Sequence, residues 1–172
     1  IKEVYDNDTV DIYSLLSPAI DEGLIIKYGN KFRFAHDRVS EAIYTLHDQI
    51  ELKNIHYKIG KALLKEIDSS KKLESAYSIA NQLNKAIDLI NNSSEKIELA
   101  ELNLRAGLKA KYSNAYENAY NFFETGIFLL PEDTWHSNYE LTLSLYNESL
   151  KTAYLLSNLE EADYFFKEIT QN

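Results

Sequence analysis

The sequence predicts an all-α protein of stacked antiparallel helical hairpins, preceded by a small segment with a helix, a β-hairpin and a second helix. Three observations lead to this prediction. Only 2 prolines and 5 glycines interrupt 172 residues, which favours long helices joined by short turns. Apolar residues recur at helical spacing over most of the chain after Asp48. Small residues also recur at intervals close to the length of a helical hairpin.

Composition and charge exclude several classes of protein. Hydrophobic residues make up 45% of the chain and charged residues 26%, as in globular proteins. The net charge of −9 disfavours nucleic acid and anionic membranes as partners, because both present negative phosphates. No apolar run approaches the ~20 residues that a membrane-spanning helix needs. Without cysteine there are no disulfides or thiolate sites, which is compatible with a reducing compartment but does not prove one. The expected location is the cytoplasm.

The first 47 residues predict the helix, the β-hairpin and the second helix. The first helix has apolar residues at helical spacing and stops at Gly23, and Pro18 either kinks it or starts a short second helix after Ser17. Two runs of strand-forming residues then flank Gly29-Asn30, a dipeptide that tolerates positive φ and suits a tight hairpin. From His36 the helical period returns, and one face of this helix is apolar: Val39, Ala42, Ile43 and Leu46.

From residue 48 onwards the chain is predicted to be helical to its end. An apolar stripe spans 55–67, and polar turns divide the rest into helices near 74–90, 94–112, 115–130, 139–156 and 159–169. Ser94 is the expected N-cap of its helix. That helix is apolar on two faces, as a helix inside a stacked array requires. The segment PEDTWHSN is expected to be a loop, anchored by Trp135 against the neighbouring hairpin.

Residues 100–133 fit one tetratricopeptide unit. Gly107 is followed by Ala119, Phe123 completes an A-x3-F pattern with Ala119, and Pro131 ends the second helix. Small residues let two helices approach closely, and the aromatic ring fills the space beside them. We therefore expect Gly107 and Ala119 to meet at a close helix crossing.

The same pattern recurs less completely on both sides of this unit. A second A-x3-F lies at Ala162 and Phe166, and an upstream glycine, Gly60, has a similar setting. The complete unit departs from the family pattern at Asn103, where Trp is usual, and at Ala110, where Tyr is usual. We interpret residues 48–172 as three hairpins of roughly 40 residues, stacked as a tetratricopeptide-like superhelix. The alternative is an irregular helical bundle.

Several blocks of the sequence resemble one family of large bacterial signalling proteins. They are FRFAHDRVSEAIY (32–44), IHYKIGKALL (55–64), NQLNKAIDLI (81–90), ELAELNLRAGLKAKYSNAY (98–116) and GIFLLPEDTW (126–135). The family joins a serine/threonine kinase-like domain, an ATPase module of the STAND (AAA-type) kind, a helical repeat region and often a sensor histidine kinase. Nearly the whole chain is similar to the region that follows the ATPase module. The resemblance implies that residues 1–47 are the winged-helix-like end of that module and 48–172 the repeat region.

The resemblance also implies a nucleotide-sensing role for His36. In STAND proteins a histidine at the end of the winged-helix hairpin contacts the diphosphate of bound ADP, and His36 matches it only if the upstream ATPase core is present. The alternative is that His36-Asp37 simply starts the next helix. The five glycines form no phosphate-binding loop, so we expect no cofactor in this segment. His47, His56 and His136 lack the spacing of a metal site.

Tyrosine is abundant, with 13 in the chain, and many tyrosines lie in the C-terminal half. Aromatic side chains are enriched at binding hot spots, so we take five as candidate partner-binding residues: Tyr112, Tyr116, Tyr120, Tyr139 and Tyr146. The alternative is that they pack between helices. Paired acidic residues fall at predicted helix ends, and no catalytic residue is expected.

Together these features predict a non-catalytic regulatory or protein-interaction segment of a multidomain signalling ATPase or kinase. Its partner would be a protein or peptide, including other domains of the same parent chain. The chain begins at Ile1 and contains no methionine, so we expect part of a longer protein rather than a processed mature chain. The alternatives are a free-standing tetratricopeptide-like adaptor, an enzyme without a recognisable motif, and a DNA-binding winged helix, which acidic residues disfavour: Asp11, Asp21 and Glu22.

Overall fold

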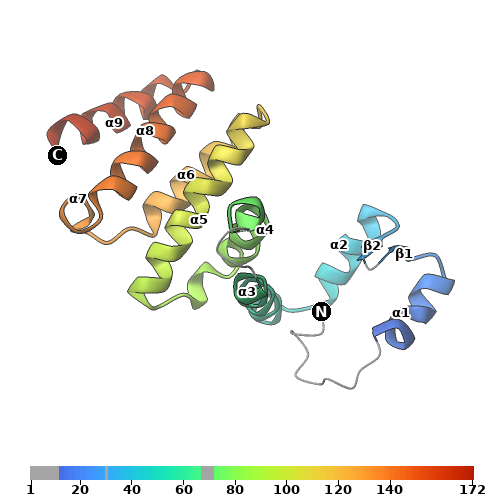
Figure 1. Cartoon of the computed structure of the whole chain (residues 1–172). Helices are drawn as coiled ribbons and strands as arrows, with labels where there is room; N and C mark the ends of the chain where they lie inside the picture. Colours follow the sequence, from blue (N-terminus) through green and yellow to red (C-terminus); the bar gives the residue numbers. More distant parts are fainter. Residues whose placement is uncertain (1–11, 30, 67–71) are drawn as a thin grey trace.

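The computed structural model describes residues 12–29, 31–66 and 72–172 of the chain. The described part is mostly helical and has one small two-stranded sheet near its N-terminal end (Figure 1). Two regions follow each other along the chain. We call residues 12–47 the N-terminal unit and residues 49–171 the helical array.

The N-terminal unit has the predicted order of elements. These are α1 (Ile12–Asp21), β1 (Ile25–Tyr28), β2 (Lys31–Phe34) and α2 (Asp37–Leu46). Helix α1 continues through Pro18, whose missing N–H leaves the Ser14 carbonyl without its usual helical donor. The Ser17 hydroxyl donates to that carbonyl at 3.1 Å instead. Gly23 ends the helix with a φ of +69°, as the sequence predicted.

The β-hairpin forms where the sequence predicted it. The strands pair antiparallel, with Tyr28 opposite Lys31, so the turn is two residues long. Gly29 has a φ of +56°, the left-handed conformation that such turns need and that glycine adopts without steric cost. Asn30, the second turn residue, lies outside the described residues.

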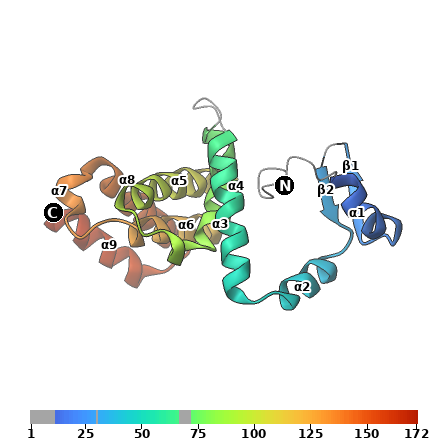
Figure 2. The same ribbon diagram turned by 90° about the horizontal axis from the view of Figure 1, so that it is seen from below.

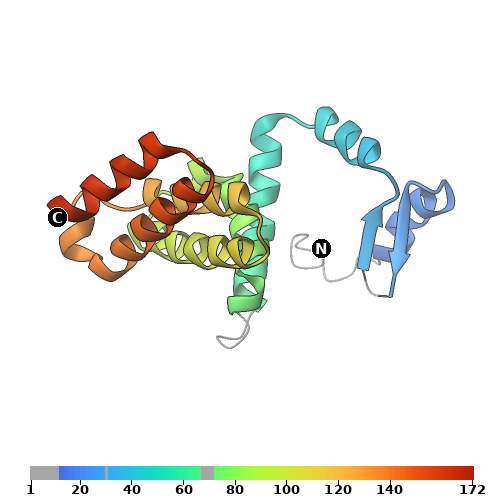
Figure 3. The same ribbon diagram turned by 90° about the horizontal axis from the view of Figure 1, so that it is seen from above.

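The helical array is a linear stack of antiparallel neighbours. Its long helices are α3 (Gln49–Glu66), α4 (Lys72–Asn84), α5 (Ser93–Tyr112), α6 (Tyr116–Phe128), α8 (Tyr139–Leu155) and α9 (Leu159–Gln171). Helices that are consecutive in this order pack against each other. Figures 2 and 3 show α3 at one end of the array, between the other helices of the array and the N-terminal unit.

Three larger differences from the sequence prediction concern helix ends and a loop. The helix expected at 74–90 ends at Asn84, and a 3-10 turn, η1 (Ile87–Leu89), follows because Ala86 has a non-helical backbone (φ −122°, ψ 24°). The N-cap of α5 is Asn92, not Ser94, since the Asn92 carbonyl oxygen accepts from the main-chain N–H groups of Ser94 and Glu95. Part of the expected PEDTWHSN loop forms one helical turn, α7 (Thr134–Ser137).

The two predicted turns in the C-terminal half are confirmed. Asn114 follows α5 with a φ of +59°, and Ser157 follows α8 with a φ of +61°. Both residues occupy the left-handed region that ends many helices. They fix where α6 and α9 turn back along their neighbours.

Two glycines of the array lie where the next helix leaves no room for a side chain. A Cβ on Gly107 would lie 2.3 Å from Phe123 Cε1, and a Cβ on Gly60 would lie 2.4 Å from Leu83 Cδ2. Each glycine therefore faces the next helix in the stack, and the two have equivalent roles. The expected meeting of Gly107 and Ala119 stays a prediction: Ala119 is fully buried, and the three atoms nearest to a Cβ on Gly107 belong to the ring of Phe123.

The second A-x3-F match is wrong in register. Ala162 is buried, but Phe166 is 56% exposed and the preceding residue, Phe165, is only 3% exposed. Helix α9 packs mainly against α8 and also meets α6 through the ring of Tyr120, and Phe166 lies on its exposed face. The aromatic residue that completes the core is therefore the one that points towards α8.

Apolar burial differs between the two regions. One continuous core extends from α4 through α5 and α6 to α8, and a second cluster joins α8 and α9. A reciprocal carboxamide pair crosses the first core, because Asn84 and Asn103 each donate to the other at 2.7 and 2.9 Å. Among the described residues of the N-terminal unit, by contrast, none is buried.

Candidate functional site

Tyr112 and Tyr116 flank the turn between α5 and α6. Tyr112, at the end of α5, is 86% exposed. The Tyr116 hydroxyl donates to the Asn114 carboxamide oxygen at 3.0 Å, which fixes its side chain over the turn. These two candidate partner-binding residues therefore lie together at one end of their helices.

Tyr120 and Tyr146 pack inside the C-terminal part of the array. Both rings meet Phe165 edge-on, with centroid distances of 6.3 and 5.9 Å. Burial and then Tyr164 and Glu168 raise the pKa of Tyr146 to about 12, while burial and then Glu124 and Glu161 raise the pKa of Tyr120. Both phenols are therefore neutral near pH 7, and their rings help to join α6, α8 and α9.

Tyr139 begins α8 and lies elsewhere. Its ring is 6.2 Å from Trp135, and the residue is 47% exposed. Trp135 also contacts Tyr146 of α8, at 5.0 Å, so it anchors α7 against this hairpin as the sequence predicted. The α5–α6 turn and α7 lie at opposite ends of α6 (Figure 1). The structure thus does not bring the five tyrosines onto one surface.

His36 lies between β2 and α2 and is exposed. It occupies the N-cap position of α2, with extended backbone (φ −140°, ψ 147°), but its side chain makes no capping hydrogen bond. Its contact with a nucleotide stays a prediction. Within the described parts of the chain, no cluster of three or more His, Cys, Asp or Glu side chains could hold a metal ion.

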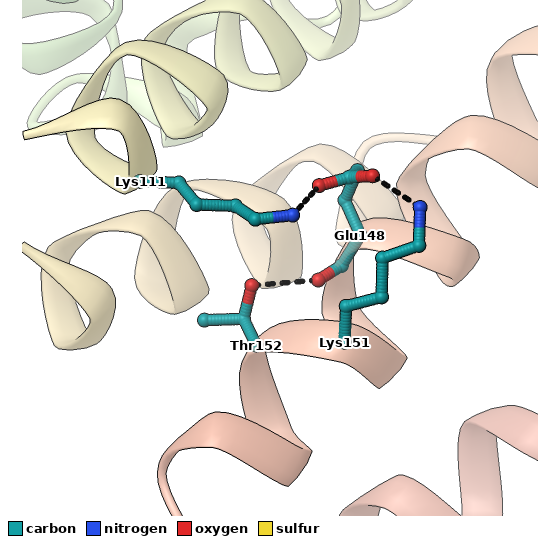
Figure 4. Close-up of polar contacts among 4 residues, drawn as sticks. All are labelled: Lys111, Glu148, Lys151 and Thr152. Atoms are coloured by element: carbon teal, nitrogen blue, oxygen red, sulfur yellow. Dashed lines mark hydrogen bonds and ion pairs between the residues drawn. The ribbon is translucent and has the colours of Figure 1, made fainter. Parts of the chain in front are cut away.

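Glu148 of α8 is a largely enclosed acidic group with two basic partners. Its side chain is 14% exposed and accepts from Lys111 Nζ at 2.5 Å and from Lys151 Nζ at 2.8 Å (Figure 4). Lys111 belongs to α5, whereas Lys151 lies one turn further along α8. The carboxylate therefore joins the first helix of one hairpin to the first helix of the next.

The charge state of Glu148 follows from these contacts. Burial alone raises the pKa of this carboxyl, but the hydrogen bonds and positive charges of Lys111 and Lys151 outweigh burial and lower it below its ordinary value. Glu148 is ionised at neutral pH. A carboxylate held between two lysines is not available as a general acid, so the cluster is a structural link.

A hollow of about 210 Å³ lies between α4 and α6. We call it the asparagine hollow, because its lining includes four asparagines besides two aromatic rings: Asn81, Asn84, Asn118, Asn121, Tyr77 and Phe122. The two rings meet edge-on at 5.2 Å. No charged residue of the described chain lines it. It is therefore a neutral, amide-rich concavity on an acidic protein.

Sequence reasoning missed this hollow, although the sequence carries a signal for it. Asn81 and Asn84 are three residues apart within α4, as Asn118 and Asn121 are within α6. Residues at this spacing share a helix face. Asparagine is a weak helix former, so two such pairs within helices indicate a role other than helix stability.

The fold thus defines an all-helical array of packed hairpins. Comparison with known proteins relates it to a signalling protein: over 165 residues the chain is 27% identical to hybrid signal transduction histidine kinase G of Dictyostelium discoideum. This similarity covers 82% of the chain but only 5% of that protein. No family model matches the chain, and no solved structure matches it significantly.

The comparison bears on the sequence-based resemblance in part. It confirms a distant relation to a region of a hybrid histidine kinase, whereas the family was expected in bacterial proteins. The name of the relative assigns no role to the matching region. Among the described helices, none is long and apolar enough to cross a membrane.

Proposed function

We propose that this chain is a non-catalytic regulatory and protein-interaction segment of a multidomain signalling protein of the ATPase–kinase hybrid kind. The observation that carries the proposal is the linear stack from α3 to α9, in a chain related to a small part of a hybrid histidine kinase. Stacked hairpins offer extended surfaces rather than one enclosed site. In large signalling chains such surfaces dock peptides or neighbouring domains.

The array is assigned here to the tetratricopeptide-like class. Support comes from the equivalent glycines Gly60 and Gly107, each covered by a side chain of the paired helix. Ala119 and Phe123 are both fully buried, as the family pattern requires. The match at α9 is imperfect, because Phe165 rather than Phe166 is buried.

The N-terminal unit, in this proposal, is the winged-helix-like end of an ATPase module, and the repeat region starts at residue 48. Its exposed apolar side chains support that assignment, for example Leu46 at 82%, Tyr28 at 61% and Leu15 at 57%. A segment with exposed apolar side chains and no buried residue is stabilised when another part of the protein covers those side chains. His36 would contact nucleotide only in that complete module.

The partner is proposed to be a protein or peptide in the cytoplasm, including other domains of the parent chain. The net charge of −9 favours a partner with basic residues, and their association should weaken as salt rises. Tyr112 and Tyr139 are the exposed members of the predicted tyrosine set and the first to test at the interface.

The decisive experiment reads the gene upstream of the codon for Ile1 and then deletes the array from the encoded protein. We expect an upstream phosphate-binding loop, and we expect deletion of 48–172 to alter the regulation of ATP turnover without abolishing nucleotide binding. A start codon directly before Ile1 would instead favour the free-standing adaptor. ATP binding by residues 1–172 alone, measured by calorimetry, would contradict the non-catalytic assignment.

A further inference from the structure

The asparagine hollow holds polar groups that the fold does not use. Asn84 is committed to Asn103 by two hydrogen bonds. Within the described part of the chain, the carboxamides of Asn81, Asn118 and Asn121 have no hydrogen-bond partner. Each carboxamide carries two N–H donors and a carbonyl acceptor. Three such groups therefore face one concavity with their hydrogen-bonding capacity open.

The surroundings of these groups select against charged ligands. More than a quarter of the chain is charged, yet no charged residue of the described chain lines the hollow. A phosphate or a carboxylate would find no cation there, and a lysine or arginine would find no anion. A neutral ligand with alternating donors and acceptors fits this lining.

The aromatic pair beside the asparagines supplies an apolar contact. Tyr77 of α4 and Phe122 of α6 meet edge-on at 5.2 Å, and Tyr77 remains 37% exposed. An apolar side chain can pack on this exposed ring while polar groups reach the carboxamides. The hollow thus offers both kinds of contact that a peptide segment needs.

The spacing of the carboxamides matches an extended peptide. Residues three apart on a helix have Cβ atoms about 5–6 Å apart. In an extended strand, peptide groups that face the same side repeat about every 6.6–6.8 Å. A carboxamide side chain adjusts over the difference, so neighbouring asparagines can meet successive main-chain groups on one side of a strand.

We propose that the asparagine hollow binds an extended, uncharged peptide segment through its main chain. Asn118 and Asn121 on α6 and Asn81 on α4 exchange hydrogen bonds with its peptide groups, while one apolar side chain packs on Tyr77. The inference rests on the proposed interaction function and specifies the chemistry of the seated segment. Recognition through the main chain makes binding tolerant of sequence and sensitive to loss of peptide N–H groups.

The test uses the whole 172-residue chain labelled with ¹⁵N, because asparagine side-chain NH₂ groups give their own signals. The probe is the capped neutral heptapeptide acetyl-Ser-Thr-Val-Phe-Val-Thr-Ser-amide. We expect it to shift the NH₂ signals of Asn81, Asn118 and Asn121. A scrambled peptide of the same composition should bind equally, and a version N-methylated at alternate residues should bind at least tenfold more weakly.

The matched variants are Asn118→Ala with Asn121→Ala, and Asn91→Ala as the control. Both hollow positions are exposed on α6, and alanine is the better helix former, so the fold is retained. Asn91 is also exposed but does not line the hollow. We expect the double variant to bind at least tenfold more weakly and the control to bind like the unchanged chain.

Several results would overturn the inference. These are equal binding by the double variant, undiminished binding of the N-methylated peptide, or absence of binding by the neutral peptide. Shifts of the same signals by a neutral oligosaccharide such as maltotriose, with none from the peptide, would make the hollow a carbohydrate site instead. Deleting the array from the parent protein tests the proposed function separately, so the two failures are distinguishable.

Discussion

The N-terminal unit and the helical array contain similar elements but bury their apolar side chains to very different extents. Phe34 in β2 is 40% exposed, whereas Phe123 in α6 is fully buried. Both are phenylalanines within regular secondary structure, Phe34 in a strand and Phe123 in a helix. The difference lies in what packs against each residue: Phe123 covers Gly107 of α5, whereas the elements of the described chain that pack against the two-stranded sheet are the short helices α1 and α2.

This contrast separates two requirements for a stable fold. Local pattern forms helices and a hairpin in both regions, but only stacking neighbours close a core. An isolated two-stranded sheet is marginal in water, and a helical stack becomes stable as each hairpin covers the next. The array should therefore fold by itself, whereas the N-terminal unit should need contacts with another part of the protein to be stable.

The largest expected effect comes from dividing the chain between the two regions. Residues 48–172 should unfold cooperatively, with a Tm within roughly 5 °C of that of the whole chain. Residues 1–47 alone should show no cooperative transition. Circular dichroism during heating measures both, and a cooperative transition in residues 1–47 would contradict the comparison.

A matched pair of substitutions tests burial directly. Phe123→Ala should lower the free energy of unfolding by about 3–5 kcal/mol, because it empties a fully enclosed site. Phe34→Ala should change it by less than about 1 kcal/mol, because its side chain stays largely in water. Urea unfolding followed by circular dichroism, which reports the helices of both regions, gives both values. Equal losses would mean that the two regions share one core.

Crowding at the α5–α6 contact should have a smaller effect. Gly107→Ala gains helix propensity but places a Cβ 2.3 Å from the Phe123 ring, so we expect a net loss of about 1–3 kcal/mol. Adding Phe123→Leu should make the combined loss smaller than the sum of the two, because the smaller side chain leaves room for the methyl group. Strict additivity in urea unfolding would show that the two residues do not meet.

The smallest effect concerns the charge link between α5 and α8. Glu148→Gln should cost about 1–2 kcal/mol at pH 7, as expected for partly enclosed charged hydrogen bonds. The folded state lowers the pKa of Glu148, so its stabilisation is present above the ordinary pKa of 4.5 and is lost as pH falls below it. The variant should therefore lose less stability than the parent between pH 5 and about pH 3. Parallel acid curves would refute this role.

Much of the fold could be predicted from the sequence, because the determining signals are local. Helical period placed α1, α2 and the helices of the array, and Gly23, Asn114 and Ser157 ended helices where they were expected. Gly29 placed the hairpin. The glycine spacing indicated the positions, Gly60 and Gly107, at which one helix of a hairpin lies close to the other.

The rest depended on three-dimensional neighbours that a linear pattern does not specify. Phe165 and Phe166 are equally plausible core residues until the direction of α8 is known. Asn92 and Ser94 are both good caps, and only the backbone shows which one the helix uses. The asparagine hollow combines two distant helices, so neither pair of asparagines shows it alone.

Helix α3 has a mechanical consequence. It is one unbroken rod of 18 residues, about 27 Å long, and a helix of that kind resists stretching. His56 of α3 is buried, and its Nδ1 atom lies 2.7 Å from the side-chain oxygen of Gln82 in α4. The ring of His56 also stacks on Tyr44 of α2. A rotation of the N-terminal unit relative to α3 therefore either separates Tyr44 from the His56 ring or moves the N-terminal part of α3 as well. In the second case, the end of the helical array moves with it.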